Sequence, residues 1–391
     1  MFKFHPFMNE TDNSHKALWS AIWLGIVGSA IFNLEPLFLA AATEQFQLSN
    51  KQIGFLASSE LAGIALASVT TPLWLPRFDK RHLAYIGLLL IASGNLVSIG
   101  CDSFDELLRT RFLTGVFGSG VVYVIAIVTL GNKGGSVKNF GLLIFSQMLF
   151  SGITLSLLPS VTLHFSLMHI LLFLSFLGAT ALLVVQFIPA RSKEEAANIP
   201  PKITLNGYGF LALTGMFLIA FNLGSIWSYA ERIGVSSGLD IQEIGALLGL
   251  SMLPQAIGAI IPSLLGRRIG YTIPLVVALS GQIIGLFILA KAENASGYFW
   301  GISLWGSCLN LGIAYKLGLI SELPNKNRLL ALVPGVQAVA IASSSSFCAL
   351  FILNNDFSPV IFIAAISVVL SFILFIFLSM TNVNYRLNTV N

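Results

Sequence analysis

Long apolar runs are the feature that most constrains this chain. A helix needs about 20 apolar residues to cross the hydrocarbon core of a bilayer, and twelve runs of this size lie between short polar connections. Only 10% of the residues are charged, whereas soluble domains carry about 25%. We therefore expect an all-α polytopic membrane protein with twelve transmembrane helices, at residues 18–42, 53–75, 83–101, 107–130, 140–163, 169–188, 207–230, 244–265, 272–290, 298–320, 329–353 and 360–380.

One polar stretch, PARSKEEAANIPPK, divides the twelve runs six and six. Lys and Arg favour cytoplasmic loops, and fifteen of them lie in one set of connections against four in the other. Both termini are therefore expected in the cytoplasm, with a bacterial inner membrane as the location. The expected organisation is an N-terminal tail (1–17), a six-helix bundle (18–188), a cytoplasmic linker (189–203), a second six-helix bundle (204–380) and a C-terminal tail (381–391).

The two halves also resemble each other in sequence. Parallel halves of a transporter place the substrate site near the midplane, between them. Five ordered matches share an offset of about 190 residues: FNL at 32–34 with 221–223, QIG at 52–54 with EIG at 243–245, Pro72 with Pro262, Arg77 with Arg267, and Gln147 with Gln337.

An arginine lies inside the fourth apolar run. Arg111 is four to seven residues from the polar edge of that run, which places it about 6–11 Å deep at 1.5 Å per residue. A charge at the membrane centre costs at least ~2.5 kcal/mol, so we expect Arg111 to line a solute pathway. The alternative is a snorkelling arginine beside a packing seam made by Gly115, Gly118 and Gly120.

Two carboxylates lie at a similar depth on neighbouring helices. Glu35 is about 11 Å and Glu60 about 12 Å from the outer surface at this rise per residue. A carboxylate that alternates between an ion pair and desolvated surroundings can bind and release a proton. We therefore expect Glu35, Arg111 and Glu60 to form a proton-coupling cluster. Glu35 could instead belong to a structural salt bridge, and Glu60 could serve only to balance Arg111 or help to close an outer gate. Pro36 predicts a bend that lines a cavity.

Several polar or aromatic side chains could contact a solute in such a cavity. Asn and Gln can equally tie helices together, so this alternative stays open for each of them. Lys316, near the cytoplasmic end of the tenth run, is expected to snorkel to the surface. The candidate substrate-binding residues are Asn33, Gln147, Asn222, Asn310, Gln337, Tyr123 and Trp227; Gln255 and Trp305 are further candidates.

Two motifs are similar to those of the major facilitator superfamily of secondary transporters. The stretch RFLTGVFG, which begins at Arg111, is similar to the fourth-helix motif of that family. The stretch PLWLPRFDKR at 72–81 lies where the family has its loop signature, with Pro76 in place of the acidic residue that helps lock the outward-facing state. The resemblance covers nearly the whole chain and implies two pseudo-symmetric six-helix bundles.

The resemblance also implies roles for individual residues. Glu35 and Arg111 look like the acid–arginine pair that couples protons to transport in the proton-coupled sugar porters of this superfamily. The basic positions of the loop signature, Arg77, Lys80 and Arg81, are expected to form a conformational gate. The Gly-Pro signature typical of the antiporters is missing from 140–163, which favours uptake by symport.

These features lead us to expect a monomeric secondary active transporter of a small organic solute, coupled to protons and working by alternating access. Proton-driven efflux of cationic or amphipathic drugs, a passive facilitator and a non-transporting receptor are the alternatives. Substrate identity and the direction of transport stay open. The sequence contains no motif for an enzyme, a cofactor or a nucleic-acid site, and its three cysteines, Cys101, Cys308 and Cys348, lack metal-ligand spacing.

Overall fold

The computed structural model describes residues 10–157, 166–190, 207–352 and 356–390, and this part of the chain is almost entirely helical. Most of the predicted linker, and the end of the predicted fifth run at 158–163, lie outside the described residues. The helices of the described chain form twelve rods, in the order that the apolar runs predict. Among the described residues, seven continuous helical stretches are by themselves long and apolar enough to cross a bilayer.

The first six rods come from the N-terminal half. Two of them are interrupted, because the first consists of three helices and the fourth contains a π-helical turn. In chain order, the six rods are α1 (Glu10–Gly28), α2 (Ala30–Asn33) and α3 (Glu35–Phe46); α4 (Asn50–Trp74); α5 (Lys80–Ile99); α6 (Phe104–Thr114), the π turn η1 (Gly115–Ser119) and α7 (Gly120–Asn132); α8 (Ser136–Leu157); and α9 (Leu167–Leu182), followed by the 3₁₀ turn η3 (Val185–Phe187).

The other six rods come from the C-terminal half, and each is one helix. They are α11 (Gly207–Ser236), α12 (Ile241–Leu265), α13 (Thr272–Ala290), α14 (Ala295–Ile320), α15 (Lys326–Ala349) and α16 (Ser358–Val390).

The second rod of each half begins with the same kind of cap. At the start of α4 the Ser49 hydroxyl accepts from the Gln52 amide, and the Gln52 side chain accepts from the Ser49 amide in return. At the start of α12 the Asp240 carboxylate accepts from the Glu243 amide at 2.8 Å. These side chains satisfy amide groups that have no partner inside the helix. The repeat seen in the sequence therefore corresponds to a repeat in local structure.

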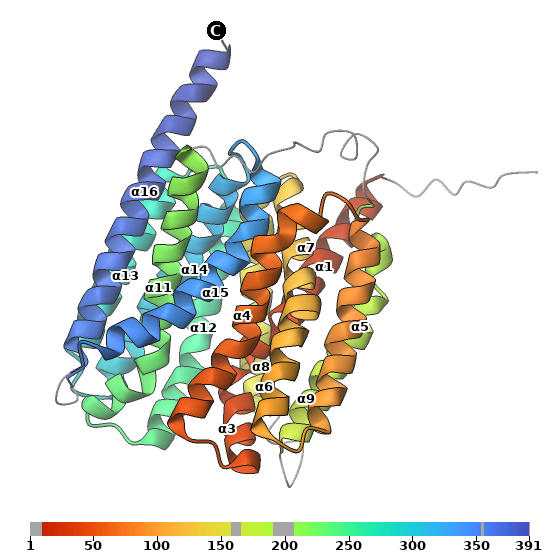
Figure 1. The fold of residues 1–391 in the computed structure, drawn as a ribbon. Coiled ribbons are helices and arrows are strands. Elements are labelled where there is room, and N and C mark those ends of the chain that lie inside the picture. Colours follow the sequence, from red (N-terminus) through yellow and green to blue (C-terminus); the bar gives the residue numbers. More distant parts are fainter. Residues whose placement is uncertain (1–9, 158–165, 191–206, 353–355, 391) are drawn as a thin grey trace, which may run out of the picture.

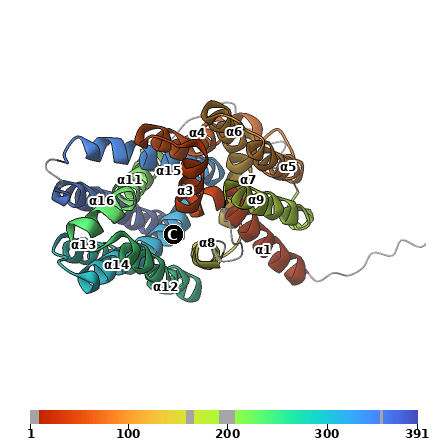
Figure 2. The same ribbon diagram turned by 90° about the horizontal axis from the view of Figure 1, so that it is seen from below.

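The rods gather into two bundles (Figures 1 and 2). Helices α11, α13, α14 and α16 lie on one side and α1, α5, α6 and α9 on the other. Between the bundles, α4 packs against α15, and α8 packs against α12 and α14. The second rod of one half thus meets the fifth rod of the other half twice, which is the arrangement that a pseudo-two-fold axis produces.

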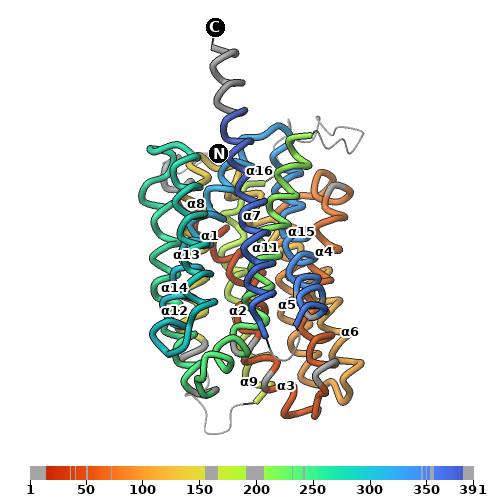
Figure 3. The backbone as a smooth tube through the Cα atoms, turned by 90° about the vertical axis from the view of Figure 1, so that its left-hand side faces the viewer, coloured from red at the N-terminus to blue at the C-terminus, as the bar shows by residue number. Residues whose placement is uncertain are grey.

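Helix α1 begins and α16 ends at the same end of the molecule, which we call the terminal end (Figure 3). The bundles contact each other closely there. The Ser136 and Ser321 hydroxyls, from opposite halves, are 2.6 Å apart, and Ser263 Oγ donates to the Lys138 carbonyl at 3.0 Å. A Cβ on Gly141 would lie only 2.8 Å from Ser263 Oγ. The two halves are therefore joined at the terminal end.

The first rod differs most from its prediction. Helix α1 begins inside the predicted tail of residues 1–17, and α16 continues through most of the predicted tail of 381–391. The bend expected at Pro36 lies earlier, because helical geometry is interrupted at Ser29 and Leu34. Gly28 lies against the Tyr123 backbone, where a Cβ would be 2.8 Å from the Tyr123 amide nitrogen. Close packing on α7 therefore contributes to the position of the first interruption.

Candidate functional site

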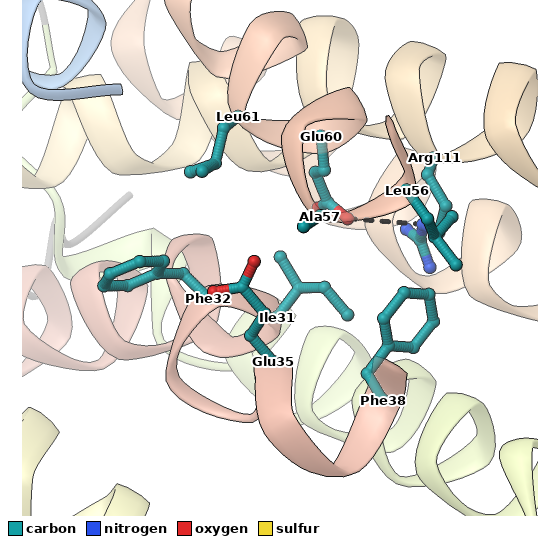
Figure 4. Close-up of a pocket in the computed structure, with 9 residues that line it drawn as sticks. All are labelled: Ile31, Phe32, Glu35, Phe38, Leu56, Ala57, Glu60, Leu61 and Arg111. Carbon is teal, nitrogen blue, oxygen red and sulfur yellow. Dashed lines mark ion pairs between the residues drawn. The ribbon is translucent and has the colours of Figure 1, made fainter. Parts of the chain in front are cut away.

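A small pocket lies between α2, α3, α4 and α6 (Figure 4). Its volume is about 20 Å³, which is room for one or two water molecules. It combines three ionisable side chains with aliphatic and aromatic ones. The lining residues are Ile31, Phe32, Glu35, Phe38, Leu56, Ala57, Glu60, Leu61 and Arg111.

Arg111 and Glu60 form a buried ion pair in this pocket. Arg111 Nε lies 3.2 Å from Glu60 Oε2, and the two side chains are 1% and 6% exposed. The other carboxylate oxygen, Glu60 Oε1, accepts a hydrogen bond from Ser119 Oγ at 2.6 Å. Arg111 also donates from Nη1 to Asn95 Oδ1 at 2.6 Å. The two charged side chains thus hold each other in place, and one neutral side chain, Ser119 or Asn95, holds each of them; the four residues come from three rods.

Close contact between α4 and the fourth rod positions this pair. A Cβ on Gly63 of α4 would overlap the Phe112 carbonyl, and a Cβ on Gly115 would overlap the carbonyl of Glu60 itself. The two backbones can approach this closely because both residues are glycines. The packing seam of the alternative reading is thus present at Gly115, but Arg111 beside it is buried and does not snorkel to the surface.

Glu35 lines the same pocket without an ion pair or side-chain hydrogen bond to any described residue. Figure 4 shows its carboxylate directed from α3 towards the α4 side of the pocket, where Glu60 lies. The expected Glu35–Arg111 pair is therefore not formed in this structure, since Arg111 is paired with Glu60. All three ionisable residues nevertheless line one pocket, as expected from their similar depths. Phe38 also lines this pocket, and the centre of its ring lies 6.0 Å from Cζ of the Arg111 guanidinium.

A second polar cluster surrounds the first interruption of the first rod. Gln147 Nε2 donates to Ser29 Oγ at 2.7 Å, and Asn33 Nδ2 donates to the same hydroxyl at 3.1 Å. The Tyr123 hydroxyl is within hydrogen-bonding reach of Gln147. Three of the predicted substrate-binding residues of the N-terminal half therefore meet around Ser29, although two of them bond to it and so also join helices.

The predicted binding residues of the C-terminal half do not meet in this way. Asn222 is fully buried, accepts from the Trp305 indole at 3.1 Å and donates to the Ala364 carbonyl at 3.1 Å. Asn310 donates to the Gln255 carbonyl at 3.3 Å. For Asn222, Asn310 and Trp305 the geometry is therefore that of helix-to-helix bonding.

The other two candidates of that half are less enclosed. Gln337 and Trp227 are half-buried and form no side-chain hydrogen bond to the described residues. They are therefore more available to a solute than Asn222 or Asn310.

Lys316 does not snorkel, so that expectation is wrong. The side chain is fully buried; its Nζ donates to Ser371 Oγ at 2.9 Å and lies 3.7 Å from the centre of the Phe372 ring. The Phe372 and Phe375 rings of α16 lie over the amine and, with Ser371, enclose it away from the surface. Sequence alone could not show which face of the tenth rod is covered.

The predicted gate residues lie at the terminal end. Arg81 Nε donates to the Ile188 carbonyl at 2.5 Å, which connects the start of α5 to the end of the sixth rod. Arg77 donates to the Leu73 carbonyl of its own turn. Lys80 begins α5 and follows Asp79, which caps that helix. Their role as a gate stays a prediction.

The equivalent loop of the C-terminal half contains a cluster that the sequence analysis missed. Arg267, the counterpart of Arg77 in the repeat, lies 2.6 Å from Glu322. The Tyr271 hydroxyl donates to the same carboxylate at 2.7 Å. Glu322 directly follows Ser321, which contacts the other half. The acidic residue in the polar SELPNKNR stretch after the tenth run was the available signal.

Twelve rods of the described chain, in two bundles related by a pseudo-two-fold axis, define the fold class. The chain has the fold of the major facilitator superfamily, which confirms the resemblance seen in the sequence. No family model matches the chain. An uncharacterised MFS-type transporter of Enterobacter sp. (strain 638) is 26% identical over 279 residues, which are 69% of this chain and 71% of that protein.

Solved structures of transporters share this fold. The MFS transporter FucP in the outward conformation has a TM-score of 0.75 at 15% identity, covering 94% of this chain and 99% of that one. The human organic anion transporter MFSD10 (TETRAN) has a TM-score of 0.73 at 14% identity, covering 92% of this chain and 99% of that one. The proton:xylose symporter XylE has a TM-score of 0.71 at 15% identity, covering 92% of this chain and 94% of that one. All of these are transporters and not enzymes.

Proposed function

We propose that this chain is a secondary active transporter that moves a small organic solute across a membrane by alternating access and couples that movement to protons at Glu35. The observation that carries the proposal is the state of Glu35: its carboxylate lines a pocket beside a buried ion pair and has no partner of its own among the described residues. A group in this position can bind a proton in one conformation and release it in another.

The small volume of the pocket supports a role in coupling. A cavity of about 20 Å³ admits water or a proton carrier, but not an organic solute. The solute would bind elsewhere between the bundles, where Gln337 and Trp227 are half-buried and without side-chain hydrogen bonds to the described residues. Fucose:proton and proton:xylose symporters are among the proteins with this fold, which agrees with coupling to protons.

The contacts between the bundles support an outward-facing state. On α4, Glu60 precedes Ser68 by eight residues, about 12 Å at 1.5 Å per residue, and Ser68 lies against Gly335 of the other half. The pocket is therefore displaced from this crossing towards the end opposite the termini. With the termini in the cytoplasm, as the distribution of Lys and Arg predicts, the structure is closed on the cytoplasmic side.

One observation favours a second candidate, proton-driven efflux of organic cations. With Glu60 and Arg111 neutralising each other, an ionised Glu35 is the one uncompensated charge among the pocket residues, which also include the Phe32 and Phe38 rings. Aromatic faces attract cations. A cationic solute could compete with the proton for Glu35 once the pocket widens, and exchange would follow.

Transport into proteoliposomes under an imposed pH gradient tests the proposal. The solute would first be found by a thermal-shift screen of sugars, amino acids, organic acids and cationic dyes. Glu35→Gln keeps the shape and the hydrogen-bonding groups but cannot ionise, so uphill accumulation should be lost while exchange of solute for solute continues. The direction of the pH gradient that drives uptake by the wild-type protein also distinguishes symport, in which solute and protons move the same way, from exchange, in which they move in opposite directions. If the Glu35→Gln protein still concentrates solute in response to the gradient, Glu35 is not the coupling site.

A further inference from the structure

The fourth rod contains a π-helical turn, Gly115–Ser119, directly after the helix that carries Arg111. A π turn holds one residue more than an α-helical turn and is rare. At its end lies Ser119, which is 3% exposed. Ser119 and Arg111 contact different oxygens of the same carboxylate, that of Glu60.

The π turn explains how two residues so far apart on one rod can reach one carboxylate. Ser119 follows Arg111 by eight residues, and in a regular α-helix this separation turns the two side chains about 80° apart. A π turn takes up one residue, so the remaining separation corresponds to seven, only about 20° short of two full turns. Ser119 is thereby brought under Arg111, on the face that meets Glu60.

Helix α4 fits against this turn. A Cβ on Gly63 would lie 2.7 Å from the Val116 amide nitrogen, inside the turn. Just after it, a Cβ on Gly120 would lie 3.0 Å from Ile64 Cα. The backbone of α4 therefore runs along the π turn and holds Glu60 opposite both Arg111 and Ser119.

We propose that Ser119, presented by this π turn, is a positioning residue that keeps Glu60 ionised as the standing counter-ion of Arg111, so that Glu35 is the carboxylate of the pocket that exchanges its proton. The role given to Glu35 rests on the proposed function, whereas the role given to Ser119 can be tested without transport. The two acids at similar depth thus have different roles: Glu60 completes an ion pair, and Glu35 titrates.

The groups that face Glu60 are few. Arg111 approaches from α6 and Ser119 from the π turn, while Glu35 faces the same pocket from α3. Asn95 of α5 is neutral and bonds to Arg111 rather than to the carboxylate. Without the Ser119 hydroxyl, one oxygen of Glu60 loses its donor, and an ion with fewer donors is protonated more easily.

Infrared difference spectroscopy of the purified protein tests this inference without any solute. The readout is the carbonyl stretch of a protonated carboxyl group on acidification from about pH 8 to pH 5, a range that brackets the titration of a perturbed glutamate. In the Glu35→Gln background no buried carboxyl band should appear. In Ser119→Ala/Glu35→Gln a band from one carboxyl group should appear, and adding Glu60→Gln should remove it.

Two controls separate positioning from a general loss of structure. Ser119→Thr keeps the hydroxyl and should restore the silent spectrum in the Glu35→Gln background. Ser175→Ala removes another buried serine hydroxyl, which bonds to the Ala92 carbonyl on the α5–α9 contact, and should not produce the band. A band in Glu35→Gln alone, or none in Ser119→Ala/Glu35→Gln, would overturn the inference. If the spectra are as expected but the Glu35→Gln protein still concentrates solute in response to the pH gradient, the result counts against the proposed function instead.

Discussion

Arg111 has three kinds of partner although it is only 1% exposed: the Glu60 carboxylate, the Asn95 amide oxygen and the Phe38 ring. Each removes part of the cost of burying a guanidinium. The mutual dependence of the two charges matters most, because breaking a buried pair leaves the remaining charge uncompensated. The pair should therefore be more sensitive to loss of one member than to loss of both.

This sensitivity can be measured as thermal stability in detergent. Arg111→Met strands Glu60 and should lower the free energy of unfolding by about 3–5 kcal/mol, whereas Arg111→Met/Glu60→Met should recover most of that loss. Arg109→Met on the exposed side of the same helix is the matched control and should change stability little. A double variant as unstable as the single one would show that the charges are stabilised separately. Neither Arg111 variant should transport.

The similar depths of Glu35, Glu60 and Arg111 place them at one level of the membrane but do not decide which acid pairs with the arginine. Glu35 and Glu60 have similar depths, so the distances along their helices are equally compatible with pairing to Arg111. The choice depends on rotation about the helix axis, and the interruptions at Ser29 and Leu34 change that rotation for Glu35. Asn95 and Ser119 were missed because one is a single amide in an apolar run and the other lies at a spacing that no regular α-helix brings to the Arg111 face.

At the level of elements, the contact between α4 and the fourth rod depends on glycine. Gly63→Ala would place a methyl group against the Phe112 carbonyl and the Val116 amide, where backbone cannot move aside easily. We expect a loss of about 1–3 kcal/mol of stability, as for overpacked cores, together with impaired transport. Thermal unfolding with proteoliposome uptake checks both effects.

Gly54 provides the control in the same helix. Nothing lies within 4 Å of a Cβ at Gly54, so Gly54→Ala should be neutral or stabilising by up to about 1 kcal/mol, the difference in helix propensity. Equal effects of the two substitutions would show that the α4 contact is not close-packed.

The rods themselves were predictable, because each required a run of apolar residues of fixed length and each run is bounded by polar residues or caps. Their ends and interruptions were not. The π turn at Gly115–Ser119 leaves no distinctive sequence pattern beyond its glycines, and α16 continues past its apolar run because the polar residues that follow do not prevent a helix. Tertiary packing decides such details, as it does for the covered face of Lys316.

For the whole molecule, alternating access requires the contacts at the terminal end to open. The Ser136 and Ser321 hydroxyls are 2.6 Å apart across the two halves. Ser136→Cys/Ser321→Cys, in a background with the three native cysteines replaced by serine, should form a disulfide on oxidation and abolish transport, which reductant should restore. Each single cysteine variant should remain active under oxidation. A cross-linked protein that still transports would show that this contact persists throughout the cycle.

The interrupted first rod also bears on how the chain enters the bilayer during synthesis. It leaves the ribosome before the other rods described here, yet because it is interrupted, none of its three helices is by itself both long and apolar enough to cross a membrane. It carries Glu35 next to an interruption and Pro36, which has no amide hydrogen to donate. An isolated helix with these features is weakly retained by hydrocarbon. Its stable insertion should therefore wait until the fourth and sixth rods, against which it packs most, have been made, so the N-terminal bundle is expected to assemble as a group rather than helix by helix.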